Sequence, residues 1–141
     1  MMEIVGLLAA AGLAAAGALH AVWAFSPWPA ADRTTLAKVV LGDEGEGFPW
    51  APACVGMAAV LAGAGYVVAA RSGLLPVIGP RQLYTVGAWT IAAGLLARGS
   101  VFPAVITLRG RSGPEFKTWD LRVYTPVCLV LGGLSLAVAL N

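Results

Sequence analysis

Residues 4–25 read IVGLLAAAGLAAAGALHAVWAF, and this stretch decides the fold. Apart from one histidine, it contains only apolar residues and glycine. About 20 apolar residues are needed to cross the hydrocarbon core of a bilayer, so the stretch predicts a transmembrane helix. The preceding Met1-Met2-Glu3 lacks the basic residues of a secretory signal, which favours a retained span. His20 is the only histidine of the chain, and an ionisable group inside a membrane is a candidate functional residue.

Three further stretches have a similar length and composition: residues 51–70, 84–102 and 121–140. The backbone finds no water to bind inside a bilayer, so uninterrupted apolar runs of this kind form helices. Of the 141 residues, 59% are hydrophobic and 11% are charged, against about 25% charged in a typical soluble domain. We therefore expect an all-α fold, in which residues 1–141 form a single transmembrane domain built as a four-helix bundle.

The composition also excludes several classes of partner. The net charge is only +2 and is scattered along the chain, so we expect no nucleic-acid partner. One histidine and two separated cysteines do not make a conventional zinc site, and no phosphate-binding glycine loop is present, so we expect no metal and no cofactor. Cys54 and Cys128 are expected to be small buried residues, with a catalytic thiol as the alternative. The acidic run 43–46 is expected to be a solvated loop, with weak cation binding as the alternative.

Four spans would leave two unequal faces. Both termini and the loop 71–83 would share one face, and the loops 26–50 and 106–119 would share the other. Basic residues near the span ends favour the long-loop face by six to two: Arg33, Lys38, Arg109, Arg111, Lys117 and Arg122 against Arg71 and Arg81. The positive-inside rule then places the long loops in the cytoplasm. The composition, rich in Ala, Gly and Arg, indicates a bacterial source and hence a bacterial inner membrane.

The first long loop contains a further helical pattern. Residues 32–42 read DRTTLAKVVLG and place Leu36, Val39 and Val40 at positions i, i+3 and i+4. This spacing predicts a short amphipathic helix, and its position between two spans predicts that it lies at the membrane interface.

Three ionisable residues are predicted to lie in the same half of the membrane. His20 ends the first span, Asp120 opens the fourth, and Arg98 lies late in the third. We expect them to form a catalytic group in which Asp120 and His20 exchange protons, while Arg98 holds an anion or tunes Asp120. Aromatic residues near that face are expected to bind the substrate: Trp23, Tyr124, Trp28 and Trp119. Trp50 lies at the same face.

Each candidate has a simpler alternative. His20 could bond to a backbone carbonyl, Asp120 could cap the fourth helix, and Arg98 could extend to the lipid headgroups. The tryptophans could form an ordinary aromatic belt. The common depth of His20, Cys54, Arg98 and Asp120, which come from four separate spans, favours the functional interpretation.

Three local patterns occur together in this chain: LHAVWAFSPWP at 19–29, Arg98 in the third span, and KTWDLRVYTPVCLVLG at 117–132. Together they resemble a family of small bacterial four-span membrane proteins of unknown function. The family pattern has His-x-x-Trp at the end of the first span and Asp-x-x-x-Tyr-x-Pro at the start of the fourth. In this sequence those positions are His20, Trp23, Asp120, Tyr124 and Pro126. The resemblance implies an architecture and candidate residues without an established activity.

The leading functional hypothesis is an intramembrane enzyme that performs isomerisation, cyclisation or epoxide opening on a lipophilic small molecule. One alternative is a small proton-coupled transporter, in which the chain would form a homodimer and Asp120 would couple the proton. The other is an accessory subunit of a larger membrane complex, in which Arg98 and Asp120 would form a structural salt bridge. In all three the protein contacts membrane lipid.

Overall fold

A computed structural model describes residues 1–42, 51–110 and 113–141. The expectations for the acidic run 43–46, Trp50 and Arg111 therefore lie outside the described residues. The described helices are α1 (Met2–Phe25), α2 (Arg33–Val40), α3 (Ala51–Arg71), α4 (Arg81–Arg109), α5 (Pro114–Trp119), the π-helix η1 (Asp120–Tyr124) and α6 (Thr125–Leu140). The described part of the chain contains no strand, which confirms the predicted all-α fold.

Four helices are long and apolar enough to cross a membrane: α1, α3, α4 and the continuous helix of 27 residues formed by α5, η1 and α6. The prediction of a membrane four-helix bundle is confirmed. Helix α4 has 29 residues and extends beyond the predicted span 84–102 at both ends. At about 1.5 Å per residue it is about 43 Å long, more than the ~30 Å of a hydrocarbon core. It ends at Gly110, whose φ of +64° lies in the left-handed region that favours glycine.

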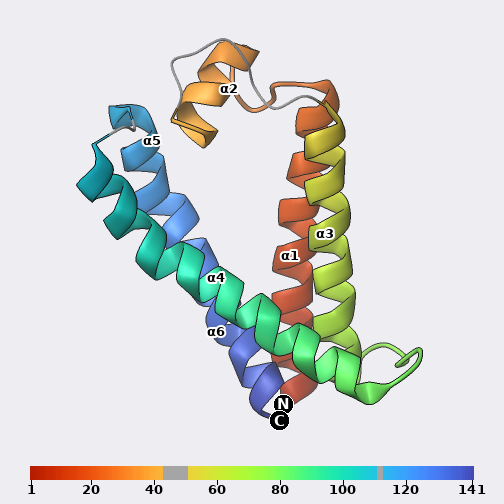
Figure 1. The fold of residues 1–141 in the computed structure, drawn as a ribbon. Helices are drawn as coiled ribbons and strands as arrows, with labels where there is room; N and C mark the ends of the chain where they lie inside the picture. The colour runs from red at the N-terminus through yellow and green to blue at the C-terminus, as the bar shows by residue number, and fades with distance from the viewer. Residues whose placement is uncertain (43–50, 111–112) are drawn as a thin grey trace.

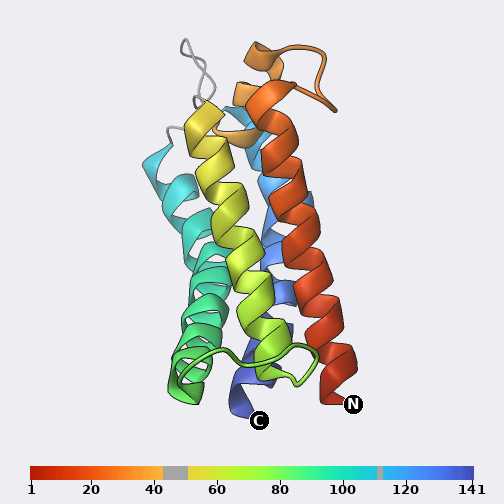
Figure 2. The same ribbon diagram turned by 90° about the vertical axis from the view of Figure 1, so that its right-hand side faces the viewer.

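The long helices associate as two pairs. Helix α1 packs most extensively on α3, and α4 packs most extensively on α6. Figure 1 shows that the pairs approach each other near the chain termini and diverge toward the end that carries α2 and α5. The view turned by 90° shows both termini at one end of the bundle and α2 and α5 at the other (Figure 2).

Glycines allow close contact within each pair. A Cβ added to Gly132 of α6 would lie 2.9 Å from Leu96 Cγ of α4, and one added to Gly99 of α4 would lie 2.8 Å from a side-chain carbon of Leu129. In the other pair, a Cβ at Gly17 of α1 would lie 3.2 Å from a backbone oxygen of α3. Without a hydrophobic driving force between helices in lipid, such close approach supplies the packing energy of the bundle.

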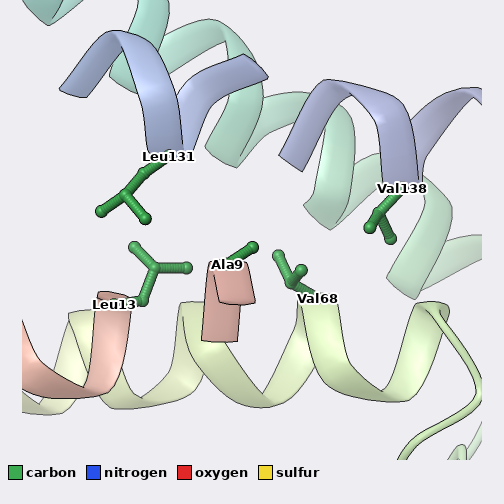
Figure 3. Close-up of a cluster of buried hydrophobic side chains, with 5 residues drawn as sticks. All are labelled: Ala9, Leu13, Val68, Leu131 and Val138. Carbon is green, nitrogen blue, oxygen red and sulfur yellow. The ribbon is translucent and has the colours of Figure 1, made fainter. Parts of the chain in front are cut away.

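The two pairs meet in one apolar cluster near the termini. Figure 3 shows Leu131 and Val138 of α6 above Ala9 and Leu13 of α1 and Val68 of α3. All five side chains are buried. This cluster fixes the pairs to each other at one end of the bundle, so the opposite end depends on α2 and α5.

Helix α2 connects the two pairs at that opposite end. Its N-cap Asp32 accepts a hydrogen bond from the Thr35 amide, a common arrangement at a helix start. Leu36 is buried in a cluster with Trp23 of α1 and Cys54 of α3. On its other side α2 packs against α5, and the Val39 carbonyl accepts a hydrogen bond from the Tyr124 hydroxyl at 3.2 Å. The short helix is thus held by both pairs.

Candidate functional site

The polar candidates form two separate centres near the α2 end of the bundle. Arg98 and Asp120 meet within the α4–α6 pair, whereas His20 belongs to the α1–α3 pair. Among the described residues, no hydrogen bond or ion pair joins His20 to either of the other two. The structure therefore brings together two of the three predicted catalytic residues.

The first centre is a buried ion pair. Arg98 Nη2 donates to Asp120 Oδ1 at 2.5 Å, and Asp120 is only 2% exposed. Thr125 Oγ1 donates to the other carboxylate oxygen at 3.4 Å. The guanidinium carbon of Arg98 lies 4.1 Å from the centre of the Phe102 ring, a favourable position for a cation. The carboxylate is thus neutralised and held by helices α4 and α6, and Arg98 does not extend to the lipid headgroups.

The π-helical turn η1 determines which side chains meet Asp120. Pro126 lacks an amide hydrogen, and its ring conflicts with the carbonyl four residues earlier in a regular α-helix. The turn just before it is wider: the Thr125 amide bonds to the Asp120 carbonyl, five residues back. Asp120 therefore shares its face with Thr125. Because helix runs continuously from Pro114 to Leu140, Asp120 is an interior residue, and the alternative in which it caps the fourth span is wrong.

The second centre contains His20. Its Nδ1 lies 2.8 Å from the Ala16 carbonyl oxygen, one turn back in α1. A carbonyl only accepts, so Nδ1 carries the proton, and Nε2 is the basic nitrogen of the neutral ring. The simple alternative of a backbone hydrogen bond therefore holds for Nδ1. The ring also contacts Trp23, with the two ring centres 4.9 Å apart.

A pocket of about 200 Å³ opens beside His20. Its walls come from three helices, α1, α2 and α3: His20, Trp23, Val40, Leu41, Ala53, Cys54 and Met57. Apart from His20, these side chains are apolar or contain sulfur, and His20 is their only strong proton acceptor. Cys54 and Met57 were missed as pocket residues because they follow no distinctive motif. The depth of Cys54 on the same side as His20 was the one available signal.

The four aromatic candidates divide into two groups. Trp23 is buried in the His20 pocket, and its indole nitrogen donates to the Trp28 carbonyl at 3.1 Å. Tyr124 contacts Phe116, with ring centres 6.4 Å apart, and its hydroxyl is bonded to α2. Trp28 and Trp119 are exposed, at 63% and 48%, as expected for an aromatic belt at the membrane interface.

Metal-ligating side chains are dispersed. In the described ranges, no group of three or more His, Cys, Asp or Glu side chains lies close enough to hold a metal ion. Both cysteines are reduced: Cys54 is buried in the His20 pocket, and Cys128 is half-buried on α6.

Comparison with known proteins gives a family without an activity. No curated protein and no solved structure matches the chain. A family model described as "Protein of unknown function (DUF3995)" matches residues 5–135, which include α3, α4, most of the first and fourth spans, and both polar centres. The chain belongs to this DUF3995 family.

Proposed function

We propose that this membrane protein is an enzyme that binds a lipophilic small molecule in the His20 pocket and performs acid/base chemistry on it. The observation that carries the proposal is the pocket itself, because a mostly apolar wall surrounds the His20 imidazole, a good proton acceptor and donor. Such pockets, mostly apolar with few convergent polar groups, are the usual form of small-molecule sites. Isomerisation, cyclisation and epoxide opening all require proton transfer and suit this set of pocket side chains.

His20 is the proton-transferring residue in this proposal. Its Nδ1 hydrogen is fixed by the Ala16 carbonyl, so the ring keeps one tautomer and one orientation. Nε2 then takes a proton from a bound molecule or, once protonated, gives one back. Trp23 covers one side of the imidazole and supplies an aromatic face that stabilises a cationic intermediate.

The Arg98–Asp120 pair acts as a positioning group. Its contacts support this role because the carboxylate is already occupied by Arg98 and Thr125. The ion pair holds η1, and η1 presents Tyr124 to the backbone of α2. Helix α2 in turn forms one wall of the His20 pocket through Val40. This replaces the direct proton exchange between Asp120 and His20 that the sequence led us to expect.

Isotope incorporation tests the proposal without knowledge of the substrate. Proteoliposomes are incubated with a bacterial lipid extract in D₂O or in H₂¹⁸O, and lipophilic compounds are compared by mass spectrometry. Isomerisation or cyclisation introduces deuterium, and epoxide opening introduces ¹⁸O. We expect a labelled product with the wild type, and loss of that product in His20→Ala and in Met57→Trp, which fills the pocket.

Val60→Trp is the matched control for the pocket variant. Val60 lies on the same helix as Met57 and is 65% exposed, outside the residues that line the pocket. It should label like the wild type. Labelling that survives both His20→Ala and Met57→Trp in folded protein would exclude this pocket as the active site, as would the absence of any labelled compound.

We place the protein in a bacterial inner membrane with the α2 end in the cytoplasm. Support comes from basic residues at that end, among them Arg33 and Lys38 on α2 and Lys117 on α5. A Lys38→Cys thiol should be protected from a membrane-impermeant reagent in intact cells. Rapid labelling from outside would reverse the orientation.

A second candidate function is that of an accessory subunit in a larger membrane complex. The observation that favours it is the Arg98–Asp120 ion pair, which joins two helices in the manner of a structural bridge. A stoichiometric membrane partner that remains bound after mild solubilisation would support this candidate. Homogeneous protein that labels a lipid by itself would exclude it as the main function.

The transport alternative is less well supported. Proton-coupled transport by a homodimer needs a carboxylate that gains and loses a proton near the middle of the membrane. Asp120 is ion-paired with Arg98, and its turn contacts α2 at one end of the bundle. Proton-coupled uptake by proteoliposomes would restore this alternative.

A further inference from the structure

A larger hollow lies at the opposite end of the molecule, where α3 ends and α4 begins. Its volume is about 380 Å³, and its polar lining consists of Arg71, Arg81, Tyr84, Thr85 and Asn141. Figure 2 shows the loop between α3 and α4 at the same end as the chain termini and far from α2. The proposed chemistry at His20 uses none of these residues.

Two tyrosines hold the loop that borders this hollow, and one of them, Tyr84, also lines it. Tyr66 of α3 donates to the Pro76 carbonyl at 2.8 Å. The Tyr84 hydroxyl accepts from the Ile78 amide at 3.0 Å and donates to the Ile78 carbonyl at 3.1 Å. The loop is therefore fixed to both flanking helices, and the two arginines are held at its two ends.

The positive charges in the hollow have no ion-pair partner among the described residues. Arg71 Nε is buried without a hydrogen-bond partner, and in the described ranges neither Arg71 nor Arg81 forms an ion pair. Arg81 is exposed and Arg71 is partly buried, so desolvation concerns Arg71 Nε, which needs an opposite charge or a hydrogen-bond acceptor to offset it. The arrangement therefore matches an anionic group supplied from outside the chain.

The start of α4 also favours an anionic group. Its N-cap is Pro80, which provides no side-chain acceptor for the first amides of a helix of 29 residues. Unpaired amides and the helix dipole make such an N-terminus favourable for a phosphate. Arg81 is the first residue of that helix, so the guanidinium and these amides belong to the same turn.

The apolar surroundings identify the source of the phosphate. Exposed apolar side chains flank the hollow on the loop and the first turn of α4: Leu74, Leu75, Ile78 and Leu83. Because the loop joins two membrane spans, these side chains lie where acyl chains meet headgroups. We infer that the hollow binds the phosphate group of an anionic phospholipid, with Arg71 and Arg81 as its ligands.

Native mass spectrometry of the detergent-purified full chain tests this inference. Dioleoyl phosphatidylglycerol is titrated against the wild type and against Arg71→Gln and Arg81→Gln. Loss of a charge-assisted hydrogen bond should weaken binding by about tenfold in each variant. Arg81 is the more exposed of the two, so Arg81→Gln keeps the test valid if Arg71→Gln does not fold.

Arg109→Gln is the matched control, since it removes one positive charge at the other end of α4. It should keep the wild-type affinity for phosphatidylglycerol, and dioleoyl phosphatidylcholine should bind the wild type more weakly. Equal losses in all three arginine variants would overturn the site. Displacement of the lipid by millimolar inorganic phosphate would overturn the lipid assignment and identify a soluble phosphate as the occupant.

Discussion

The α1–α3 pair and the α4–α6 pair both pack closely at glycines, but they use their polar residues differently. In both pairs a glycine of one helix receives the backbone or a side chain of its partner. In the α4–α6 pair, the buried Asp120 carboxylate forms an ion pair with Arg98. The α1–α3 pair leaves its histidine beside an apolar pocket, and among the described residues its hydrogen bond is to its own helix. A buried carboxylate that is ion-paired stabilises geometry, whereas an ionisable group beside a cavity remains available for chemistry.

The largest expected effect comes from breaking the Arg98–Asp120 ion pair. Arg98→Met leaves the Asp120 carboxylate buried without its cation, and loss of one partner of a buried pair costs about 3–5 kcal/mol. The side chain of Arg98 is 30% exposed, so we expect about 3 kcal/mol, near the lower limit. Thermal unfolding in detergent micelles, followed by circular dichroism, measures the loss.

Arg122→Met is the control for this variant, because Arg122 belongs to the same turn η1, is exposed and makes no ion pair among the described residues. It should leave the unfolding temperature almost unchanged. The double variant Arg98→Met with Asp120→Leu should recover much of the lost stability, since no charge then remains buried. Equal destabilisation by Arg98→Met and Arg122→Met would show that the ion pair does not hold the α4–α6 pair.

A smaller effect should distinguish the packing of the two pairs. In Gly132→Ala the new Cβ would lie 2.9 Å from Leu96 Cγ and 3.1 Å from the Leu96 amide nitrogen, so α4 and α6 must separate. Overpacking of this kind costs about 1–3 kcal/mol. In Gly17→Ala the nearest atom of α3 would be 3.2 Å away, and the loss should be smaller. Unfolding in detergent again gives the comparison.

Gly133→Ala serves as the control for this pair of variants. Gly133 is adjacent to Gly132, and a Cβ there meets nothing within 4 Å. Alanine favours a helix over glycine by about 1 kcal/mol, so Gly133→Ala should be neutral or stabilising. A greater loss in Gly17→Ala than in Gly132→Ala would mean that α1–α3 is the more tightly packed pair.

The transmembrane helices were predictable because an uninterrupted apolar run of about 20 residues forms a helix inside a bilayer. Helix α2 was predictable from the spacing of Leu36, Val39 and Val40. The surroundings of His20 were not predictable from the sequence. Hydropathy gives the depth of a residue along its helix, but it does not show which helices pack against each other. Arg98 met Asp120 because their helices happen to form one pair.

The π turn shows where a regular helical period misleads. Asp120, Tyr124 and Cys128 are four residues apart, and an α-helix would place them on one stripe. The wider turn brings Thr125 to Asp120 instead. Pro126 was the available signal, since a proline removes the amide donor that a regular turn uses, although Pro103 is accommodated within α4 without a π turn.

The smallest expected effect concerns α2, the helix that connects the two pairs. The hydrogen bond from the Thr35 amide to Asp32, at 2.7 Å, lowers the pKa of Asp32 below its usual 3.8. A lowered pKa in the folded state means that the carboxylate stabilises α2 above the unfolded pKa and loses this contribution as the pH falls through the folded value. The Thr35 amide resonance should therefore shift below about pH 3.8 in NMR spectra of the protein in micelles, while amides of the core cluster stay in place.

Asp32→Asn keeps a capping oxygen without a titrating group, so it should retain α2 and abolish the pH dependence. The same acid transition in Asp32→Asn would assign it to another group and leave α2 held by Leu36 and Val39 alone.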